Sequence, residues 1–305
     1  MRPERLLHVD RRILYLLIAL GTLIPILVPI GFPVSTTQPT ERLFEKIESL
    51  GPDDVVLISF DYGPTTAPEN APMAEAILRH CFSRRIKVVA IALFPLGGVT
   101  MAGQELALIT PEFPGLRDGE DYAFLGYKDG AQAAMKQMGV DFAAVFPTDR
   151  AGRPLAELPL MARVHNYDNI ALIVSLSTNV IAEYWVNLVN AQFRTPVAVG
   201  ATAVSAPKYF AYLDAGQMLG LLGGVKGASE YERLLIDRYP EMRPAYRKAG
   251  VYNAMKGMDA QTIDHAIIML FILVGNAAFF QMRRKTGRGG APVPGGDRSG
   301  SAARS

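Results

Sequence analysis

Two apolar stretches lie at opposite ends of the chain, and one long mixed segment lies between them. The first covers residues 13–34 and the second residues 263–281. At a helical rise of about 1.5 Å per residue, the 22 residues of the first stretch can cross a hydrocarbon core about 30 Å thick. Pro25, Pro29 and Pro33 interrupt it and predict a kink, or an end of the helix near Pro29. We therefore expect one transmembrane helix at each end.

The first stretch has a competing interpretation, because a basic start followed by an apolar run also marks a cleavable signal peptide. Signal peptides have an apolar region of about 7 to 15 residues followed by a site with small residues. Here the run is longer, and no small-x-small site follows Val34. The pattern favours an uncleaved anchor.

Between the two stretches, short apolar runs alternate with amphipathic segments. Apolar residues of the segments 71–85 and 179–193 recur at helical spacing, whereas the runs that end at Phe60 and Phe94 are short and rich in β-branched residues. Strands separated by helices at this spacing favour right-handed parallel crossovers. We predict a Rossmann-like α/β domain with a mostly parallel sheet of about five strands. The predicted strands are 55–60, 86–94, 122–125, 170–176 and 197–201, and the predicted helices include 71–85, 129–138 and 179–193.

Three local signals add further expectations. Thr40 is placed to cap a short helix that ends before Gly51. Ser229 and Glu232 have the spacing of a capping box for a helix over residues 230–238. The glycines between 216 and 227 do not fit a phosphate-binding loop, and their small size favours a close helix packing face or a membrane-proximal turn.

Positive charge lies outside the two apolar stretches and indicates the topology. Four arginines precede the first stretch, and four Arg and Lys residues follow the second by position 288. Because short basic flanks stay on the cytoplasmic side, both termini are predicted to be cytoplasmic in the cell inner (cytoplasmic) membrane. Residues 1–12 then form a basic N-terminus, 35–258 an extracytoplasmic domain, and 282–305, rich in Gly, Pro, Ser and Arg, a disordered basic tail.

The central segment itself is slightly acidic. Residues 35–258 hold 21 Lys and Arg against 24 Asp and Glu, so the +2 net charge of the chain comes from its tails. This balance argues against a nucleic-acid partner and leaves the tails to meet the lipid bilayer. Cys81 is the single cysteine, which excludes an intrachain disulfide.

Polar or glycine residues follow four of the predicted strands. The carboxyl ends of parallel strands share one edge of the sheet, where open α/β sheets bind ligands in a crevice. Ser177 and Thr178, at a helix start, suit a small anion, and the competing interpretation is a helix cap. For Asp61 the alternatives are a ligand-binding carboxylate and an Asx-turn. The ligand-binding candidates are Asp61, Gly97, Gly98, Ser177, Thr178, Asn179 and Thr202.

The usual catalytic and cofactor motifs do not occur. G-x-G-x-x-G, the P-loop and G-x-S-x-G are absent, and the four histidines are too scattered for a recognisable metal set. Ser205 and Lys208 match S-x-x-K, but so short a pattern arises by chance and favours a surface loop. We expect no cofactor and no metal.

Three polar residues interrupt the second apolar stretch. Asp264 and His265 are predicted in the first helical turn, at the interface, where water is available. Asn276 lies well inside the span, and an amide at this depth predicts a hydrogen bond to another helix, either the first span of the same chain or a helix of a partner protein or second copy.

These observations predict a membrane-anchored extracytoplasmic domain that works as a non-catalytic subunit or ligand-sensing component of a membrane complex. Two alternatives use the crevice at the strand ends. One is a hydrolase or transferase with Asp61 and Ser177 as first candidates, and the other is a solute-binding or receptor domain without chemistry.

Overall fold

The computed structural model describes residues 11–28, 30–248 and 252–286. These residues form two compact units, one made of residues 25–259 and the other of the described residues before 25 and after 259. The first unit is an α/β domain, and the second is a pair of helical segments.

The domain is built on a six-stranded sheet in which every neighbouring pair is parallel. Strand order is β3-β2-β1-β4-β5-β6, so the chain fills one half of the sheet and then returns to fill the other. All residues of β1 are buried, as a central strand covered on both faces requires. The strands are β1 (Val55–Asp61), β2 (Lys87–Ala92), β3 (Tyr122–Tyr127), β4 (Leu172–Ser177), β5 (Val197–Ala201) and β6 (Gly220–Gly223).

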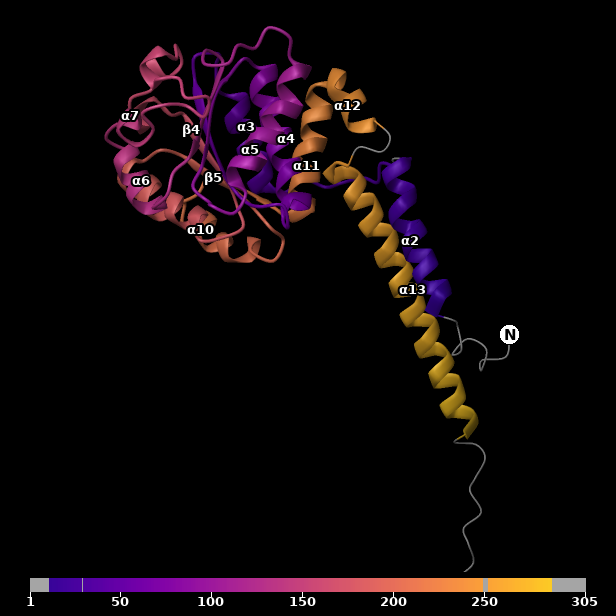
Figure 1. Ribbon diagram of the computed structural model, residues 1–305. Helices are drawn as coiled ribbons and strands as arrows, with labels where there is room; N and C mark the ends of the chain where they lie inside the picture. The colour runs from indigo at the N-terminus through magenta and orange to yellow at the C-terminus, as the bar shows by residue number, and fades with distance from the viewer. Residues whose placement is uncertain (1–10, 29, 249–251, 287–305) are drawn as a thin grey trace, which may run out of the picture. The chain divides into compact units, whose positions relative to one another are not determined.

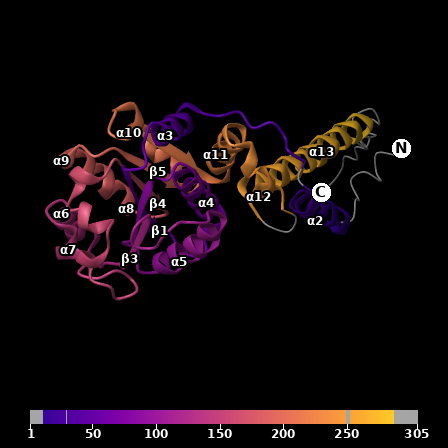
Figure 2. The same cartoon turned by 90° about the horizontal axis from the view of Figure 1, so that it is seen from above.

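Helices cover both faces of this sheet (Figures 1 and 2). One face packs against α3 (Gln38–Glu48), α4 (Ala67–Ser83), α5 (Gly98–Ile109) and α11 (Gly224–Arg238). The other packs against α6 (Ala131–Met138), α7 (Phe142–Val145), the helical stretch α8 (Ile181–Tyr184), η5 (Trp185–Asn190) and α9 (Ala191–Phe193), and α10 (Phe210–Asp214). Helix α12 (Arg243–Arg247) follows α11, and 3-10 turns occupy Thr110–Glu112, Leu155–Glu157, Met161–Arg163, Tyr167–Asn169, Ala206–Tyr209 and Pro240–Met242.

The predicted Rossmann-like α/β fold is confirmed, with six strands instead of about five. The strand that the sequence did not predict is β6. Its glycines were interpreted as a helix packing face or a turn. Gly220 is required because α3 lies directly on this strand. A Cβ at position 220 would come within 2.7 Å of the Pro39 carbonyl oxygen and 2.9 Å of the Leu43 Cβ. Glycine is uncommon in strands, so the sequence pattern concealed β6.

Two expectations at helix starts are wrong. Helix α11 begins at Gly224, so Ser229 and Glu232 lie inside it and form no capping box. Helix α3 begins at Gln38 with Thr37 as its N-cap, and the Thr40 hydroxyl instead donates to the Glu230 carboxylate at 2.8 Å. In both cases a polar residue that suits a helix cap bonds to a distant part of the chain.

The second unit consists of the parts of two helices, α2 (Arg11–Leu27) and α13 (Ala254–Thr286), that lie before residue 25 and after residue 259. Among the described residues, one helix is long and apolar enough to cross a membrane, the part of α13 over Ala254–Phe280. Its apolar side chains are mostly exposed. Helix α2 has 17 residues, about 26 Å at 1.5 Å per residue, somewhat short of a 30 Å core. It ends two residues before Pro29, which lies outside the described residues.

The two helices of this unit contact each other through a polar pair. The Thr22 hydroxyl on α2 donates to the Asp264 carboxylate on α13 at 2.8 Å. Gly21 permits this approach, because a Cβ there would lie 2.5 Å from Asp264 Oδ1 and 3.1 Å from side-chain atoms of Ile263 and Ile267. Helix α13 starts ten residues before Asp264, so the prediction that Asp264 and His265 occupy its first turn is wrong.

The predicted tails fall mostly outside the described residues. Of the predicted disordered segment 282–305, residues 282–286 continue α13, and 287–305 are not described. Of the predicted N-terminal segment 1–12, only residues 11 and 12 are described, and they begin α2.

Candidate functional site

The strand order reverses between β1 and β4, so the carboxyl ends of these two strands form the switch point where a ligand site is expected. Their register places Ser59 beside Ser175, and Asp61 beside Ser177. Four polar residues of two central strands therefore meet at one end of the sheet. The structure brings Asp61 and Ser177 together as the sequence predicted.

Asp61 is fully buried and bonds to its own strand and to the end of β2. Its carboxylate accepts hydrogen bonds from the Ser59 hydroxyl at 2.6 Å and from the Leu93 backbone N–H at 2.8 Å. Burial raises the pKa of Asp61 to about 6, although these hydrogen bonds oppose the rise. The predicted Asx-turn does not form, because the carboxylate turns back toward the sheet.

Two buried polar atoms near this carboxylate have no hydrogen-bond partner among the described residues. They are the Ser175 hydroxyl on β4 and the Trp185 indole nitrogen. Trp185 approaches Asp61 closely enough to lower its pKa, without reaching normal hydrogen-bond geometry. It is also the first residue of a π-helix, a form that is frequent at functional sites. These are the chemical features that make the switch point a candidate site.

Asn179 ties the ends of β1 and β4 together. Its amide donates to the Asp61 backbone carbonyl at 3.0 Å and accepts from the Ile181 N–H at 2.8 Å. Ser177 is buried, and its hydroxyl donates to the oxygens of Asn179. The first helical N–H is therefore satisfied by Asn179 and not by Ser177 or Thr178, the two residues predicted for a cap.

The glycines after β2 serve close packing between loops. Gly97 has a left-handed φ of 112°, which favours glycine. A Cβ on Gly98 would lie 2.3 Å from the Phe60 carbonyl oxygen, and one on Gly63 would lie 2.6 Å from the Leu96 carbonyl oxygen. The loops after β1 and β2 thus lie close together, so that a side chain at either glycine would collide with a backbone carbonyl.

The end of β5 is joined to the start of α4. The Asn70 amide donates to the Gly200 carbonyl at 3.3 Å, and the Glu69 carboxylate accepts from the Ala203 N–H at 2.7 Å. Thr202 is almost buried and donates to the Ser205 hydroxyl. All predicted residues lie at one edge of the sheet, but their polar groups bond mostly to one another and to the backbone.

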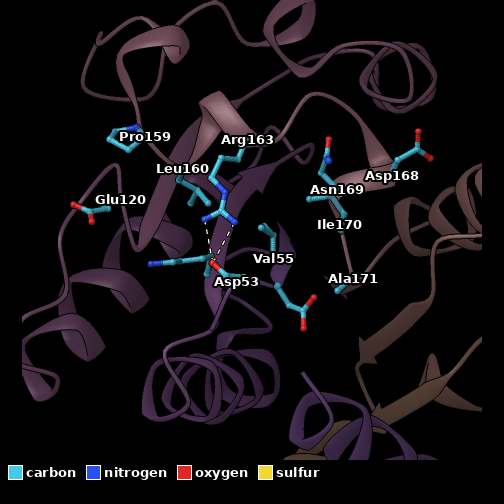
Figure 3. A pocket seen from close by; sticks show the side chains of 12 residues that line it. Asp53, Val55, Glu120, Pro159, Leu160, Arg163, Asp168, Asn169, Ile170 and Ala171 are labelled. Atoms are coloured by element: carbon cyan, nitrogen blue, oxygen red, sulfur yellow. Dashed lines mark hydrogen bonds and ion pairs between the residues drawn. The ribbon is translucent and has the colours of Figure 1, made fainter. Parts of the chain in front are cut away.

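A hollow lies at the opposite edge, at the amino ends of the strands, where no ligand site was expected (Figure 3). Its volume is about 530 Å³, and Asp53, Lys87, Glu120, Arg163 and Asp168 contribute charged side chains to it. Arg163 and Asp53 point toward each other and pair at 3.2 Å, but both are strongly exposed. Exposed pairs of this kind contribute little energy.

Two buried carboxylates, those of Glu232 and Asp259, accept hydrogen bonds from backbone N–H groups at the start of α13 and in residues 30–32. Glu232 of α11 is buried and accepts the backbone N–H groups of Ala254 at 2.9 Å and Met255 at 2.8 Å, at the start of α13. Burial raises the pKa of Glu232 to about 8. Asp259 accepts three further N–H groups at 2.8 to 3.0 Å, those of residues 30 to 32. Sequence reasoning missed this role, since it assigned Glu232 to a capping box.

No family model matches the chain, and no curated protein sequence matches it. Across residues 11–28, 30–248 and 252–286, no group of three or more His, Cys, Asp and Glu side chains is arranged to hold a metal ion.

Proposed function

We propose that this protein is a membrane-anchored α/β domain that acts as a non-catalytic subunit or ligand-sensing component of a membrane complex. In this proposal α2 and α13 both cross the membrane, both termini are cytoplasmic, and residues 35–258 are extracytoplasmic. The charge asymmetry of the flanks supports this topology. The Thr22–Asp264 hydrogen bond supports it as well, because polar pairs between helices are typical of membrane-embedded pairs.

The observation that carries the subunit role is the position of Asn276. Its side chain is exposed and makes no hydrogen bond to another described residue. Ile267, which faces Gly21 on α2, lies nine residues earlier, about half a turn around the helix from Asn276 at 3.6 residues per turn. An amide that faces lipid is costly, so a helix of another chain is the proposed partner.

The exposed polar face of α13 also includes His265. It lies eleven residues before Asn276, which places both on the same side of a helix with 3.6 residues per turn. Two polar groups three turns apart on one face favour a partner helix that runs alongside α13.

Burial supports a role without catalysis. Asp61 and Ser177, the first catalytic candidates, have 0% and 1% exposure, and their polar groups already hold Leu93 and Asn179. A nucleophile or general base must reach the substrate, and these two side chains are committed to joining strands.

Replacement of Asn276 tests the proposal. Extraction of the full chain in a mild detergent should recover a complex, and N276L should weaken it by about 1 kcal/mol, the usual contribution of such a hydrogen bond. I272L, one turn away on the exposed face of α13, is the matched control and should leave the complex unchanged. An identical co-purification profile for N276L and the parent would contradict the subunit role.

A second candidate function is ligand binding at the switch point, as in a solute-binding domain. The Ser175 hydroxyl and Trp185 indole without partners favour it, since buried polar atoms are normally hydrogen-bonded. With inorganic phosphate as the probe, S175A, which removes the hydroxyl without a partner, should then weaken binding by about 1 to 3 kcal/mol while the fold survives. Equal affinity for phosphate in parent and variant would exclude an anion site at this position.

A further inference from the structure

A small cavity lies where the α/β domain continues into α13. Its volume is about 320 Å³, at the lower end of the range of about 300 to 1,000 Å³ for small-molecule sites. Residues of α11, α12, the first turns of α13 and the segment at 30–31 line it. The cavity is therefore formed by segments that the domain packs around the start of the apolar helix.

Positive charge in this cavity exceeds negative charge. Four cationic side chains line it, Arg233, Arg243, Arg247 and Lys256, against the carboxylates of Asp237 and Asp259. Asp237 pairs with Arg233 at 2.8 Å. The Asp259 carboxylate accepts three backbone N–H groups, which compensate its charge in part.

Two of the cations have no carboxylate to neutralise them. Arg243 and Arg247 are exposed and form no ion pair within the part of the chain that the structure describes. Lys256 is 1% exposed and donates from its ammonium group to the Lys248 carbonyl oxygen. A guanidinium presents a planar fork of donors that matches the oxygens of a phosphate group. The two arginines therefore suit an anion of this kind.

The position of the cavity along α13 indicates where that anion comes from. Asp259, the last lining residue, lies four residues before Ile263, where the predicted span begins. Four residues of helix cover about 6 Å, comparable with the polar headgroup layer of about 5 to 8 Å on each side of a bilayer. Ile30, Ile236 and Met255 add apolar lining beside the cations, as a molecule with both a phosphate and a hydrocarbon part requires.

We propose that this cavity binds the phosphate group of an anionic phospholipid, with Arg243 and Arg247 as its main ligands. The inference rests on the proposed membrane anchoring and names a ligand for the sensing role. A lipid that occupies the cavity contacts α11, α12 and the start of α13 at once, so it stabilises the packing between them.

The test uses the full chain in a mild non-ionic detergent with dihexanoyl phosphatidylglycerol as the probe. The same titration with dihexanoyl phosphatidylcholine corrects for the apolar tails, and a titration with inorganic phosphate tests a soluble source. R243Q/R247Q removes the two proposed ligands. R42Q/R150Q removes two exposed charges outside the cavity and is the matched control. Circular dichroism confirms that all variants keep the parent fold.

The expected result is that the parent binds phosphatidylglycerol more tightly than phosphatidylcholine and inorganic phosphate. R243Q/R247Q should lose about tenfold or more of that affinity, whereas R42Q/R150Q should match the parent. Retained affinity in R243Q/R247Q would overturn the site, and equal or tighter binding of inorganic phosphate would overturn the lipid source. Neither outcome depends on a partner protein, so a failure here is distinct from a failure of the N276L experiment.

Discussion

Asp61 links three segments of the domain through one buried carboxylate. It joins β1 to the end of β2 through Leu93, and its backbone carbonyl accepts the Asn179 amide after β4. A charged group at this place costs solvation energy, which is why the pKa of Asp61 rises to about 6. The stability of the domain should therefore depend on the protonation of this residue.

We predict that D61N removes a component of this pH dependence. In the unfolded chain the carboxyl group has its ordinary pKa of 3.8, and in the folded chain about 6, so its contribution is complete below pH 3.8 and lost as the pH rises through 6. The free energy of unfolding of the parent relative to D61N should fall by about 2 to 3 kcal/mol between pH 4 and pH 8. Thermal unfolding of the full chain in detergent at a series of pH values measures this.

The exposed D237N is the control for the Asp61 prediction, because it changes a surface carboxylate of α11. Stability curves of D61N and the parent that run parallel from pH 4 to pH 8 would show that the Asp61 carboxyl group keeps its ordinary pKa.

Glu232 holds the first turn of α13 through two backbone N–H groups. We predict that E232A lowers the free energy of unfolding by about 2 to 4 kcal/mol, because two buried donors lose their acceptor. E232Q keeps one carbonyl acceptor, so its free energy of unfolding should fall by less than that of E232A. E241A, at an exposed position after the end of α11, should be neutral. Thermal melting in detergent ranks the variants, and a neutral E232A would mean that water replaces the carboxylate.

The sequence predicted where the candidate polar side chains lie, but it did not predict their hydrogen-bond partners. Asp61 and Ser177 are the last residues of β1 and β4, and Thr202 follows β5, so all three lie at strand ends as predicted, because a change from apolar to polar residues marks these ends. The partners of Glu230 and Glu232 are far along the chain, at Thr37, Thr40 and Ala254. Local spacing carries no information on contacts of this kind.

Helices and strands with a clear apolar pattern were predicted correctly, whereas two elements that contain glycine, β6 and α5, were not predicted. β5 has the predicted bounds of 197–201, since its apolar run is continuous. Helix α5 was not predicted, because it starts at Gly98 without a side-chain cap. The predicted helix 179–193 exists, but its middle is a π-helix. The spacing of side chains along the sequence does not predict this form.

The contact between Thr22 on α2 and Asp264 on α13 can be tested by cross-linking. In a C81S background, T22C/D264C should form an intramolecular disulfide under mild oxidation, because the two native side chains are in hydrogen-bond contact. T22C/N276C is the control, since Asn276 lies twelve residues further along α13, about 18 Å at 1.5 Å per residue. Mobility on a non-reducing gel measures the products. Equal yields from both pairs would contradict the observed pairing.

At the scale of the whole molecule, the distribution of charge predicts the topology. Reporter fusions at both termini should be active in the cytoplasm, and a fusion at residue 150 should be active outside, because the basic residues flank both apolar stretches on their terminal sides. Accessibility of residue 150 to a protease added to intact spheroplasts gives an independent measurement. If residue 150 were cytoplasmic, the predicted topology would be wrong, and α13 would cross the membrane in the opposite direction.

The Asp259 carboxylate has a consequence for how this domain could be moved between proteins. By holding the backbone of residues 30 to 32, it brings the first and last segments of the α/β domain to one point. Domains whose ends lie close together can be inserted into a host chain with little disturbance. Residues 30–259 are therefore suited to insertion into another protein, for example into the loop of an unrelated antiparallel helical hairpin.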